Sequence, residues 1–477
     1  MREYDCDVLI VGGGPVGLTL ACELALGGAH AIVLERGRRD EESEPRALTL
    51  HRRTLEHLSM RGLLPAFEEA FHELLRKYGT TDVTSAGHRP RPHFGGIAGF
   101  TPGDGEPSTV LIDHADVVRI LFERSRELGV DVRHEHAGSA VKEGDSHVAV
   151  QVTTADGVRE VTARYAVGCD GARSVVRQEA GIPFTGNEPV VLTRMGVFGG
   201  GTESLPGGWE RRDTGWFMRM IDGRIAVTEW DGPNSFDRPL GVGEFEDAIE
   251  RVTGQRVQLS DPAFLSRYSD RTALAERYRN GRTFLAGDAA HVHFPAGGQG
   301  LNLGMQDAFN LGWKLAERIR GEASAGLLDT YENERRPVAE AVLKNTQAQL
   351  ALMRPGTQVS ALRDVFQSLI EVDGVAQALH GMITGSALTL PKEDNDHPLA
   401  GRFITDVASA LPGRTFKMSA FENGGRVTFN DFDVPSGRAG RAPGPSTGSP
   451  GETVFAFRPD GYLSRVEGPW EFEELGS

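Results

Sequence analysis

The sequence predicts an α/β protein in which a sheet of parallel strands, covered by helices, is interrupted by a second, inserted β-sheet. Two continuous apolar runs, at residues 8–11 and 31–34, are typical of strands buried on both faces, and a helical pattern separates them. Strand-like segments then cluster at residues 190–198, 215–221 and 224–230. A long apolar stripe at helical spacing returns at residues 301–319.

Length and charge narrow the class of protein. A chain of 477 residues suggests about three domains at roughly 150 residues each. The net charge of −16 argues against nucleic acid or an anionic membrane as a partner. The charged N-terminus is unlike a signal peptide, and no run of about 18 apolar residues is present. We therefore expect a cytoplasmic enzyme.

The cysteines indicate neither a disulfide framework nor a metal site. Cys6, Cys22 and Cys169 are odd in number and fit no CxxC pattern. All three lie in segments that we predict to be strand or helix, where buried and inert thiols are expected. No spacing of His, Asp or Glu suggests metal ligands, so we expect no metal.

The first motif is a GxGxxG pattern that follows the first strand and opens a helix. A second strand then ends in an acid about 20 residues further on, which completes the fingerprint of a Rossmann-like dinucleotide-binding unit. The glycines permit a tight turn and let a diphosphate approach the helix N-terminus. Glu35 is expected to bind a ribose and to repel a 2′-phosphate, which favours FAD or NAD over NADP. The predicted residues of this site are Gly12, Gly14, Pro15, Val16, Gly17 and Glu35.

A second motif occupies residues 287–319, with the sequence GDAAHVHFPAGGQGLNLGMQDAFNLGWKLAERI. An acid, a proline and three glycines precede a long helix in a fixed order that a simple turn would not need. The free N–H groups and the positive dipole end of that helix would face a flat or anionic ligand.

This second motif resembles that of the FAD-dependent aromatic hydroxylases, the para-hydroxybenzoate hydroxylase-like or group A flavoprotein monooxygenases. It looks closest to their actinomycete branch, which acts on polyketide antibiotics and includes angucycline hydroxylases and rifampicin monooxygenase. The resemblance implies that Asp288 binds the ribityl chain of FAD. It also implies that the backbone of Gly300, Leu301 and Asn302 lies under the flavin N1–C2=O edge, and that Pro295 lies near the reactive carbon.

Three further segments carry the same resemblance. The string ESEPRALTLHRRTLEHL would place Arg46 against the cofactor, close to the chemistry, although a surface arginine is an equally good interpretation. Arg36 would face the adenosine, and Gly138 would lie near the adenine. The DGxxSxxR motif that begins at Asp170 would contact FAD and help a nicotinamide cofactor to bind. Asp113 stands where the family carries a glutamine that contacts the flavin.

The resemblance also implies a domain organisation. Residues 1–75, 101–185 and 277–390 would form a discontinuous FAD-binding domain, with a substrate domain from residues 76–100 and 186–276. Residues 391–477 would form a short, truncated thioredoxin-like region without redox cysteines. Trp209, Trp216 and Trp230, with the segment 94–100, could be plain core or the wall of a large apolar pocket.

The predicted function is an FAD-dependent monooxygenase that consumes NADPH or NADH. The resemblance implies that it would insert one oxygen atom from O2 into a polycyclic aromatic substrate through a flavin hydroperoxide. No second GxGxxG follows, so a nicotinamide donor would have no Rossmann site of its own, and the resemblance implies that it binds transiently. The alternatives are Baeyer–Villiger insertion on the same substrates, a non-hydroxylating flavin oxidoreductase and an FAD-bearing carrier. His291 is expected to be structural rather than a catalytic base. The sequence leaves the oligomeric state open.

Overall fold

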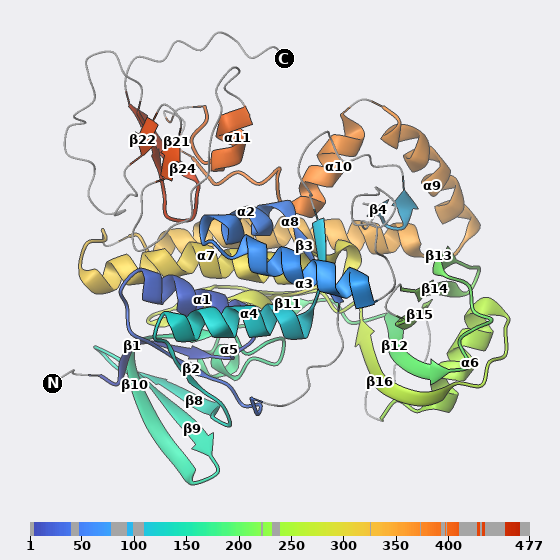
Figure 1. Ribbon diagram of the computed structural model, residues 1–477, viewed down its shortest axis with the longest axis horizontal. Helices are drawn as coiled ribbons and strands as arrows, with labels where there is room; N and C mark the ends of the chain where they lie inside the picture. The colour runs from blue at the N-terminus through green and yellow to red at the C-terminus, as the bar shows by residue number, and fades with distance from the viewer. Residues whose placement is uncertain are drawn as a thin grey trace.

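The computed structural model of the chain describes residues 4–39, 47–77, 93–98, 109–220, 223–230, 239–324, 326–372, 374–392, 396, 398–409, 427–429, 432–434 and 454–467. These residues form a mixed α/β fold. In Figure 1, long helices lie across one sheet, and a second sheet with its own helix lies beyond their ends.

The larger sheet contains eight strands. Its main path has the order β18-β19-β10-β1-β2-β7, and pairing is parallel from β19 to β7. The strands on this path are β1 (Cys6–Val11), β2 (Ala31–Leu34), β7 (Asp131–Arg133), β10 (Gly157–Gly168), β18 (Arg279–Asn280) and β19 (Thr283–Leu285). An antiparallel arm of β8 (Ala137–Glu143) and β9 (Val148–Thr154) extends from β10. Asp156-Gly157 between two alternating segments predicts a hairpin turn, which the pairing of β9 with β10 confirms. The single long strand β10 belongs to both the arm and the parallel sheet.

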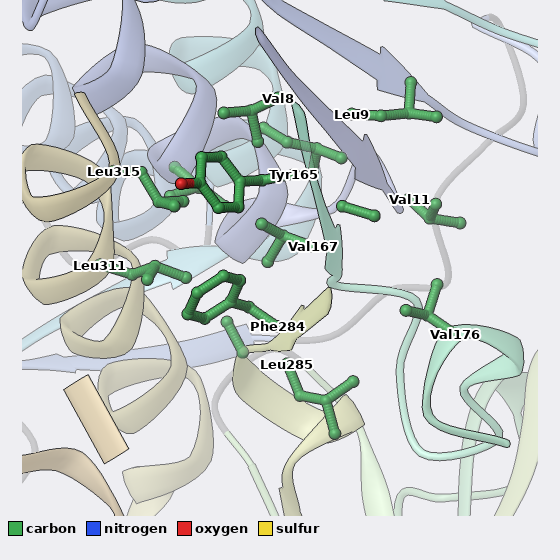
Figure 2. Packing of buried hydrophobic residues seen from close by; sticks show 14 of the residues in the cluster. Val8, Leu9, Val11, Tyr165, Val167, Val176, Phe284, Leu285, Leu311 and Leu315 are labelled. Atoms are coloured by element: carbon green, nitrogen blue, oxygen red, sulfur yellow. The ribbon is translucent and has the colours of Figure 1, made fainter. Parts of the chain in front are cut away.

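Helices cover this sheet as the apolar stripes predicted. Figure 2 shows Leu311 and Leu315 of one helix facing Tyr165 of β10 and Phe284 of β19. Complete burial of each such side chain contributes roughly 1.5–3 kcal/mol to folding. The helices in this part of the molecule are α1 (Pro15–Leu26), α2 (Arg52–Met60), α3 (Leu64–Lys77), α4 (His114–Glu127), α5 (Val175–Glu179), α7 (Gln299–Arg320) and α8 (Asp329–Met353). Of these, α2 packs on α7, and α3 packs on strand β6 (Thr109–Asp113).

Helices α1 and α7 pack closely because glycines lie at the contact between them. A side chain on Gly27 or Gly312 would overlap Ala316 or Glu23 of the opposite helix. A Cβ on Gly304 would lie 2.7 Å from Val16 Cγ2. This contact holds the first turn of α1 beside the N-terminal third of α7.

The second sheet has five antiparallel strands in the order β13-β14-β15-β12-β16. They are β12 (Val191–Gly200), β13 (Gly208–Arg211), β14 (Gly215–Arg219), β15 (Ile225–Trp230) and β16 (Ser260–Ser269). Helix α6 (Val242–Thr253) covers one face, where Phe245 packs on Phe217 and Val227. The opposite face packs against the second motif and α8.

Shorter elements complete the described fold. They are β3 (Ala47–His51), β4 (His93–Phe94), β5 (Ile97–Ala98), β6 (Thr109–Asp113), β11 (Phe184–Gly186), β17 (Ala273–Ala275), η1 (Gly287–Ala289), β20 (His291–Val292), η2 (Ala296–Gly298), α9 (Thr357–Ile370), α10 (Val375–Thr384), α11 (Ile404–Ser409), β21 (Val427–Phe429), β22 (Phe432–Val434), β23 (Val454–Phe457) and β24 (Leu463–Glu467). The antiparallel pair β3–β6 lies against α7, and β4–β5 lies against α9.

The turn residues 458–461 between two strand-like segments predict a C-terminal hairpin. The structure confirms it as β23–β24, and its turn is anchored on the helices. Arg458 Nη2 and Lys314 Nζ each lie 2.8 Å from Glu334 Oε2. Although burial alone would raise it, these two cations lower the pKa of Glu334 to about 2. Burial, then the charge of Arg458, lowers the pKa of Lys314 to about 8. The thioredoxin-like assignment of this region stays a prediction.

The three cysteines are at least partly buried in the structure. Cys6 and Cys22 are buried, and burial raises the pKa of each thiol to about 12, as expected for inert cysteines. Cys169 is half-buried, and its pKa is also raised by burial. Among the described residues, no helix combines the length and apolar character needed to cross a membrane.

Candidate flavin and substrate site

The first glycine turn, residues 12–17, joins β1 to α1, and Gly12, Gly14 and Gly17 have different roles in it. Gly12 has φ 111°, and a side chain there would overlap the carbonyl oxygen of Cys169. A side chain on Gly17 would overlap the carbonyl oxygen of Gly12. A Cβ on Gly14 would meet no atom within 4 Å. Gly12 and Gly17 therefore allow backbone packing, whereas Gly14 and Pro15 behind it present an open surface at the start of α1.

The predicted ribose ligand, Glu35, lies beside this turn. Its Oε2 accepts a hydrogen bond from Gly13 N at 2.7 Å, and Oε1 accepts one from Gly37 N at 2.7 Å. The carboxylate is therefore fixed next to the helix N-terminus. The neighbouring Arg36 is exposed. Gly138 of β8 lies against the end of β1, where a Cβ would be 2.9 Å from Val11 Cγ1.

The DGxxSxxR motif follows strand β10, which pairs with β1. It lies beside the first glycine turn, since Gly12 packs on Cys169, directly before Asp170. Asp170 Oδ2 accepts hydrogen bonds from Val175 N and Val176 N at 2.7 and 3.2 Å. Its Oδ1 is buried and has no hydrogen-bond partner among the described residues. A buried carboxylate oxygen without a donor fits a site that a ligand hydroxyl or water completes.

Arg177, at the end of that motif, ties it to the second motif. Its Nη1 donates to Ala289 O at 2.9 Å and its Nη2 to Ala172 O at 3.0 Å. The guanidinium also lies 3.9 Å from the ring centroid of Phe184. The sequence motif included Arg177 without predicting this role, which only the fold reveals.

Asp288 lies in η1, directly beyond the start of α1. Gly287 has φ 64°, and a Cβ there would lie 2.9 Å from Val16 Cγ2. Asp288 is exposed, although Gly287 and Ala289 on either side are buried. The acid is thus held by a buried turn between the first glycine turn and α7, where the resemblance requires a ribityl ligand.

The second glycine turn, residues 297–300, leads into α7. Gly297 and Gly298 are both left-handed, with φ of 70° and 63°, and the exposed Pro295 precedes them. Because the first four N–H groups of a helix have no intrahelical partner, those of Gly300 and Leu301 are available to a ligand. The dipole of α7 places partial positive charge at the same point.

A pair of side chains holds this second turn in place. Asn302 Nδ2 donates to Thr49 O at 2.7 Å and to Gly298 O at 2.9 Å, and its Oδ1 accepts from His51 N at 2.8 Å. His51 Nε2 lies 2.7 Å from Gly297 O. The sequence analysis predicted only a backbone role for Asn302 and missed His51. The available signal was a histidine that ends an alternating strand.

His291 and His293 differ in their surroundings. His291 Nε2 lies 2.7 Å from Asp307 Oδ2, and Arg335 Nε lies 2.8 Å from Asp307 Oδ1, with all three side chains buried. His291 and Arg335 lower the pKa of Asp307 against the effect of burial. This buried ion cluster supports a structural role for His291. At His293, by contrast, burial itself is the main cause that lowers the pKa.

The inner face of the five-stranded sheet is the face turned toward the second motif. Its apolar members are Val191, Met195, Trp209, Trp216, Met218, Ala226, Trp230 and Tyr268. Phe294 and Ala296, on either side of Pro295, pack against this face. Trp216 is only 2% exposed and is core, whereas Trp209 and Trp230 are half-buried. Gly96 packs on the Trp209 ring, which brings part of the segment 94–100 to the same wall.

Two further residues that the sequence analysis predicted near the cofactor are Arg46 and Asp113. Arg46 lies outside the described residues, and the described strand β3 begins at Ala47. Asp113, the residue at the family's glutamine position, pairs with Ala47 in the β3–β6 ladder and precedes α4.

Comparisons with known proteins show the family and the fold of this chain. A model of the FAD binding domain family matches residues 5–218 and 226–346. A 12-dehydrotetracycline 5-monooxygenase/anhydrotetracycline 6-monooxygenase of Streptomyces rimosus is 35% identical, over 97% of this chain and 95% of that protein. The crystal structure of CabE, an aromatic hydroxylase from angucycline biosynthesis, is 32% identical with a TM-score of 0.79, over 97% and 96% of the chains. A dialkyldecalin synthase of Streptomyces rugosporus is 38% identical over 85% of this chain and 88% of its own length.

Proposed function

The chain belongs to the FAD-dependent aromatic hydroxylases, and we propose that it inserts one oxygen atom of O2 into a polycyclic aromatic substrate of the polyketide type. The observation that carries the proposal is the position of Pro295. It stands between the N-terminus of α7 and the inner face, with Phe294 and Ala296 packed on that face. A flavin at α7 would therefore meet a substrate held by the inner face.

The glycine fingerprint and the family resemblance assign the site residues of this proposal. Gly14 and Pro15 would receive the diphosphate of FAD, Glu35 the ribose, and Asp288 the ribityl chain. The N–H groups of Gly300 and Leu301 would stabilise negative charge at the pyrimidine edge of the reduced flavin. The other proposed cofactor contacts are Gly12, Val16, Gly17, Arg36, Arg46, Gly138, Asp170 and Asn302. Arg46 and Pro295 are proposed to lie nearest to the reacting atoms.

The chemistry comes from the cofactor, and the chain supplies placement. NADPH or NADH would reduce FAD, and the reduced flavin and O2 would give the hydroperoxide that delivers the oxygen. The overall balance is substrate, O2, NAD(P)H and a proton to hydroxylated substrate, NAD(P)+ and water. The proposal retains a discontinuous FAD domain of residues 1–75, 101–185 and 277–390, a substrate domain of residues 76–100 and 186–276, and a thioredoxin-like region of residues 391–477.

The apolar members of the inner face favour a large, flat substrate. Its half-buried groups are indoles, thioethers and the phenol of Tyr268. Burial of a tetracyclic compound against them contributes roughly 25 cal/mol per Å² before the cost of ordering. The S. rimosus relative is a monooxygenase of tetracycline precursors, which supports the same substrate class here.

The test is substrate-stimulated oxidation of NADPH and NADH by the purified FAD-loaded protein. Anthracycline-, angucycline- and ansamycin-type phenols are compared with single-ring hydroxybenzoates under 18O2, and products are analysed by mass spectrometry. We expect the polycyclic phenols to stimulate turnover and to gain one 18O atom. Stimulation by hydroxybenzoates alone would contradict the substrate class. A ring-expanded lactone or ester product would instead indicate Baeyer–Villiger insertion.

A second candidate function comes from the dialkyldecalin synthase relative, which forms a carbon ring. A cyclase would use the same apolar inner face to fold a polyene and would need no nicotinamide donor. It is distinguished by product formation in the absence of NAD(P)H and O2, with no change in the oxygen content of the product.

A further inference from the structure

We propose that His51 is a positioning residue for the flavin. Together with Asn302 it forms a brace, the His51–Asn302 brace, which holds the second glycine turn in the shape that points the N-terminus of α7 at the cofactor. This inference rests on the proposed placement of FAD at that helix end.

The hydrogen bonds of His51 specify one form of its ring. His51 ends β3 and is 4% exposed. Its Nε2 lies 2.7 Å from the carbonyl oxygen of Gly297, which can only accept, so Nε2 carries a proton. Its Nδ1 lies 3.3 Å from Thr109 Oγ1 on the paired strand β6 and accepts from that hydroxyl. Nε2 is therefore a donor that points at the glycine turn, and the Thr109 hydroxyl can donate to Nδ1 of the uncharged ring.

Asn302 closes the brace from the helix side. Its amide oxygen accepts from the backbone N–H of His51, and its amide nitrogen donates to the carbonyl oxygens of Thr49 and Gly298. Strand β3, the glycine turn and the first turn of α7 are thus joined by four hydrogen bonds from two side chains, including the one to Gly297.

The second glycine turn needs such support because of its composition. Gly297 and Gly298 are consecutive and left-handed, and glycine gives up more conformational freedom on ordering than any other residue. Thr49 limits the turn from the other side, since a Cβ on Gly298 would lie 2.8 Å from Thr49 Cβ. If the turn relaxes, the N–H groups of α7 no longer point in one fixed direction, and their electrostatic effect on the flavin weakens.

Burial keeps the brace uncharged. It lowers the pKa of His51 to about 4, although the hydrogen bond to Gly297 raises it in part. At neutral pH the imidazole therefore donates a hydrogen bond without adding a positive charge beside the cofactor.

The test compares His51→Phe, His51→Gln and the control His57→Phe. Phenylalanine removes both hydrogen bonds of the ring, whereas glutamine keeps one donor and one acceptor. His57 is equally buried, donates to the Arg53 carbonyl at 2.7 Å and stacks on Phe309, but it does not contact the turn. The measurements are FAD titration of the apoprotein, the midpoint potential of bound FAD and the thermal midpoint of the apoprotein.

We expect His51→Phe to weaken FAD binding about tenfold, as loss of about 1.4 kcal/mol does, and to make the midpoint potential more negative. His51→Gln should bind FAD with an affinity within about threefold of that of the wild type. Its midpoint potential should return toward the wild-type value. His57→Phe should lower the thermal midpoint and leave the potential unchanged. Thr109→Val, which keeps the ring but removes its hydroxyl partner, should shift both properties less and in the same direction.

Equal FAD affinity and equal potential in His51→Phe and His57→Phe would reduce His51 to a structural residue while leaving the proposed function intact. If His51→Phe does not fold, an unchanged potential in Thr109→Val overturns the inference. A wild-type protein that binds no FAD would overturn the proposed function and this inference together.

Discussion

The two glycine turns of the molecule are built in opposite ways. In the first, residues 12–17, glycines contact backbone: Gly12 packs on the Cys169 carbonyl, and Gly17 packs on Gly12. In the second, residues 297–300, side chains from a distant strand hold the glycines. His51 and Thr49 are about 250 positions away in the chain from the Gly298 and Asn302 groups that they contact.

The difference shows that a glycine-rich turn can serve two structural purposes. The first turn needs only close approach of backbone, which the absence of a side chain provides. The second turn must point the end of a long helix in a fixed direction, and flexible residues achieve this only with outside support. The first turn should therefore fail through collisions, and the second through loss of hydrogen bonds.

The largest effect is expected from Gly12→Ala. The new side chain would collide with the Cys169 carbonyl at φ 111°, which we expect to destabilise the apoprotein by about 4 kcal/mol. Its matched control is Gly14→Ala, because Gly14 has φ −74° and open space around it. We expect Gly14→Ala to unfold in urea like the wild type and yet to bind FAD at least about tenfold more weakly. Equal destabilisation by both variants would contradict the division of roles in the first turn.

The second turn predicts a pH effect on stability. The pKa of His51 is about 4 in the folded protein, against an ordinary value of 6.5, and the charge of His380 contributes after burial and the Gly297 bond. The unfolded chain therefore takes up the proton first as pH falls. The resulting stability is complete above pH 6.5 and is lost toward pH 4, by about 3 kcal/mol at about 1.4 kcal/mol per pKa unit.

The comparison that isolates this effect is urea unfolding of the wild type and His51→Gln at several pH values. Other buried histidines, such as His57, also have lowered pKa values and contribute to both proteins. We expect the difference between the two proteins to be constant above pH 6.5 and to shift in favour of His51→Gln at lower pH. A difference that does not change with pH would show that His51 titrates normally.

Between the two turns lies Asp288, whose role is predicted to be chemical rather than structural. Asp288→Ala should weaken FAD binding by about 2 kcal/mol, or roughly thirtyfold, through loss of a charge-assisted hydrogen bond to the ribityl chain. Because Asp288 is exposed, the thermal midpoint of the apoprotein should hardly change. Unchanged FAD affinity would leave Asp288 a turn residue only.

The smallest effect is expected at Glu35. Its carboxylate accepts from Gly13 N and Gly37 N, and Glu35→Gln keeps only one of those two acceptors. We expect a loss of about 1 kcal/mol in FAD binding, measured by titration against wild type. A loss as large as that in Asp288→Ala would mean that Glu35 contributes to the ligand more than to the shape of the first turn.

The contrast between the turns also explains what the sequence could predict. Strands β1 and β2 and helix α1 were predicted because their apolar runs, their glycine cap and the acid at residue 35 are local signals. The terminal hairpin followed in the same way from its turn residues. Helix α7 was predicted from its stripe, although it begins at Gln299 rather than at residue 301.

The remaining features depend on contacts that no local pattern encodes. The His51–Asn302 brace, the bond from Arg177 to Ala289 and the cluster of Lys314, Glu334 and Arg458 each join segments more than 100 residues apart. Charge patterns do not tell which buried cation meets which acid, because several pairings satisfy the same composition. The fold must bring the segments together before their partners can be named.

A crystal structure of the FAD complex tests the central claim most directly, since it locates the cofactor relative to both glycine turns. We predict that the diphosphate lies against Gly14 and Pro15, and that the pyrimidine edge of the flavin lies within hydrogen-bonding distance of the N–H groups of Gly300 and Leu301. The flavin ring system should then lie next to Pro295, on the side that faces the inner face of the five-stranded sheet. A flavin bound away from the N-terminus of α7 would contradict the account.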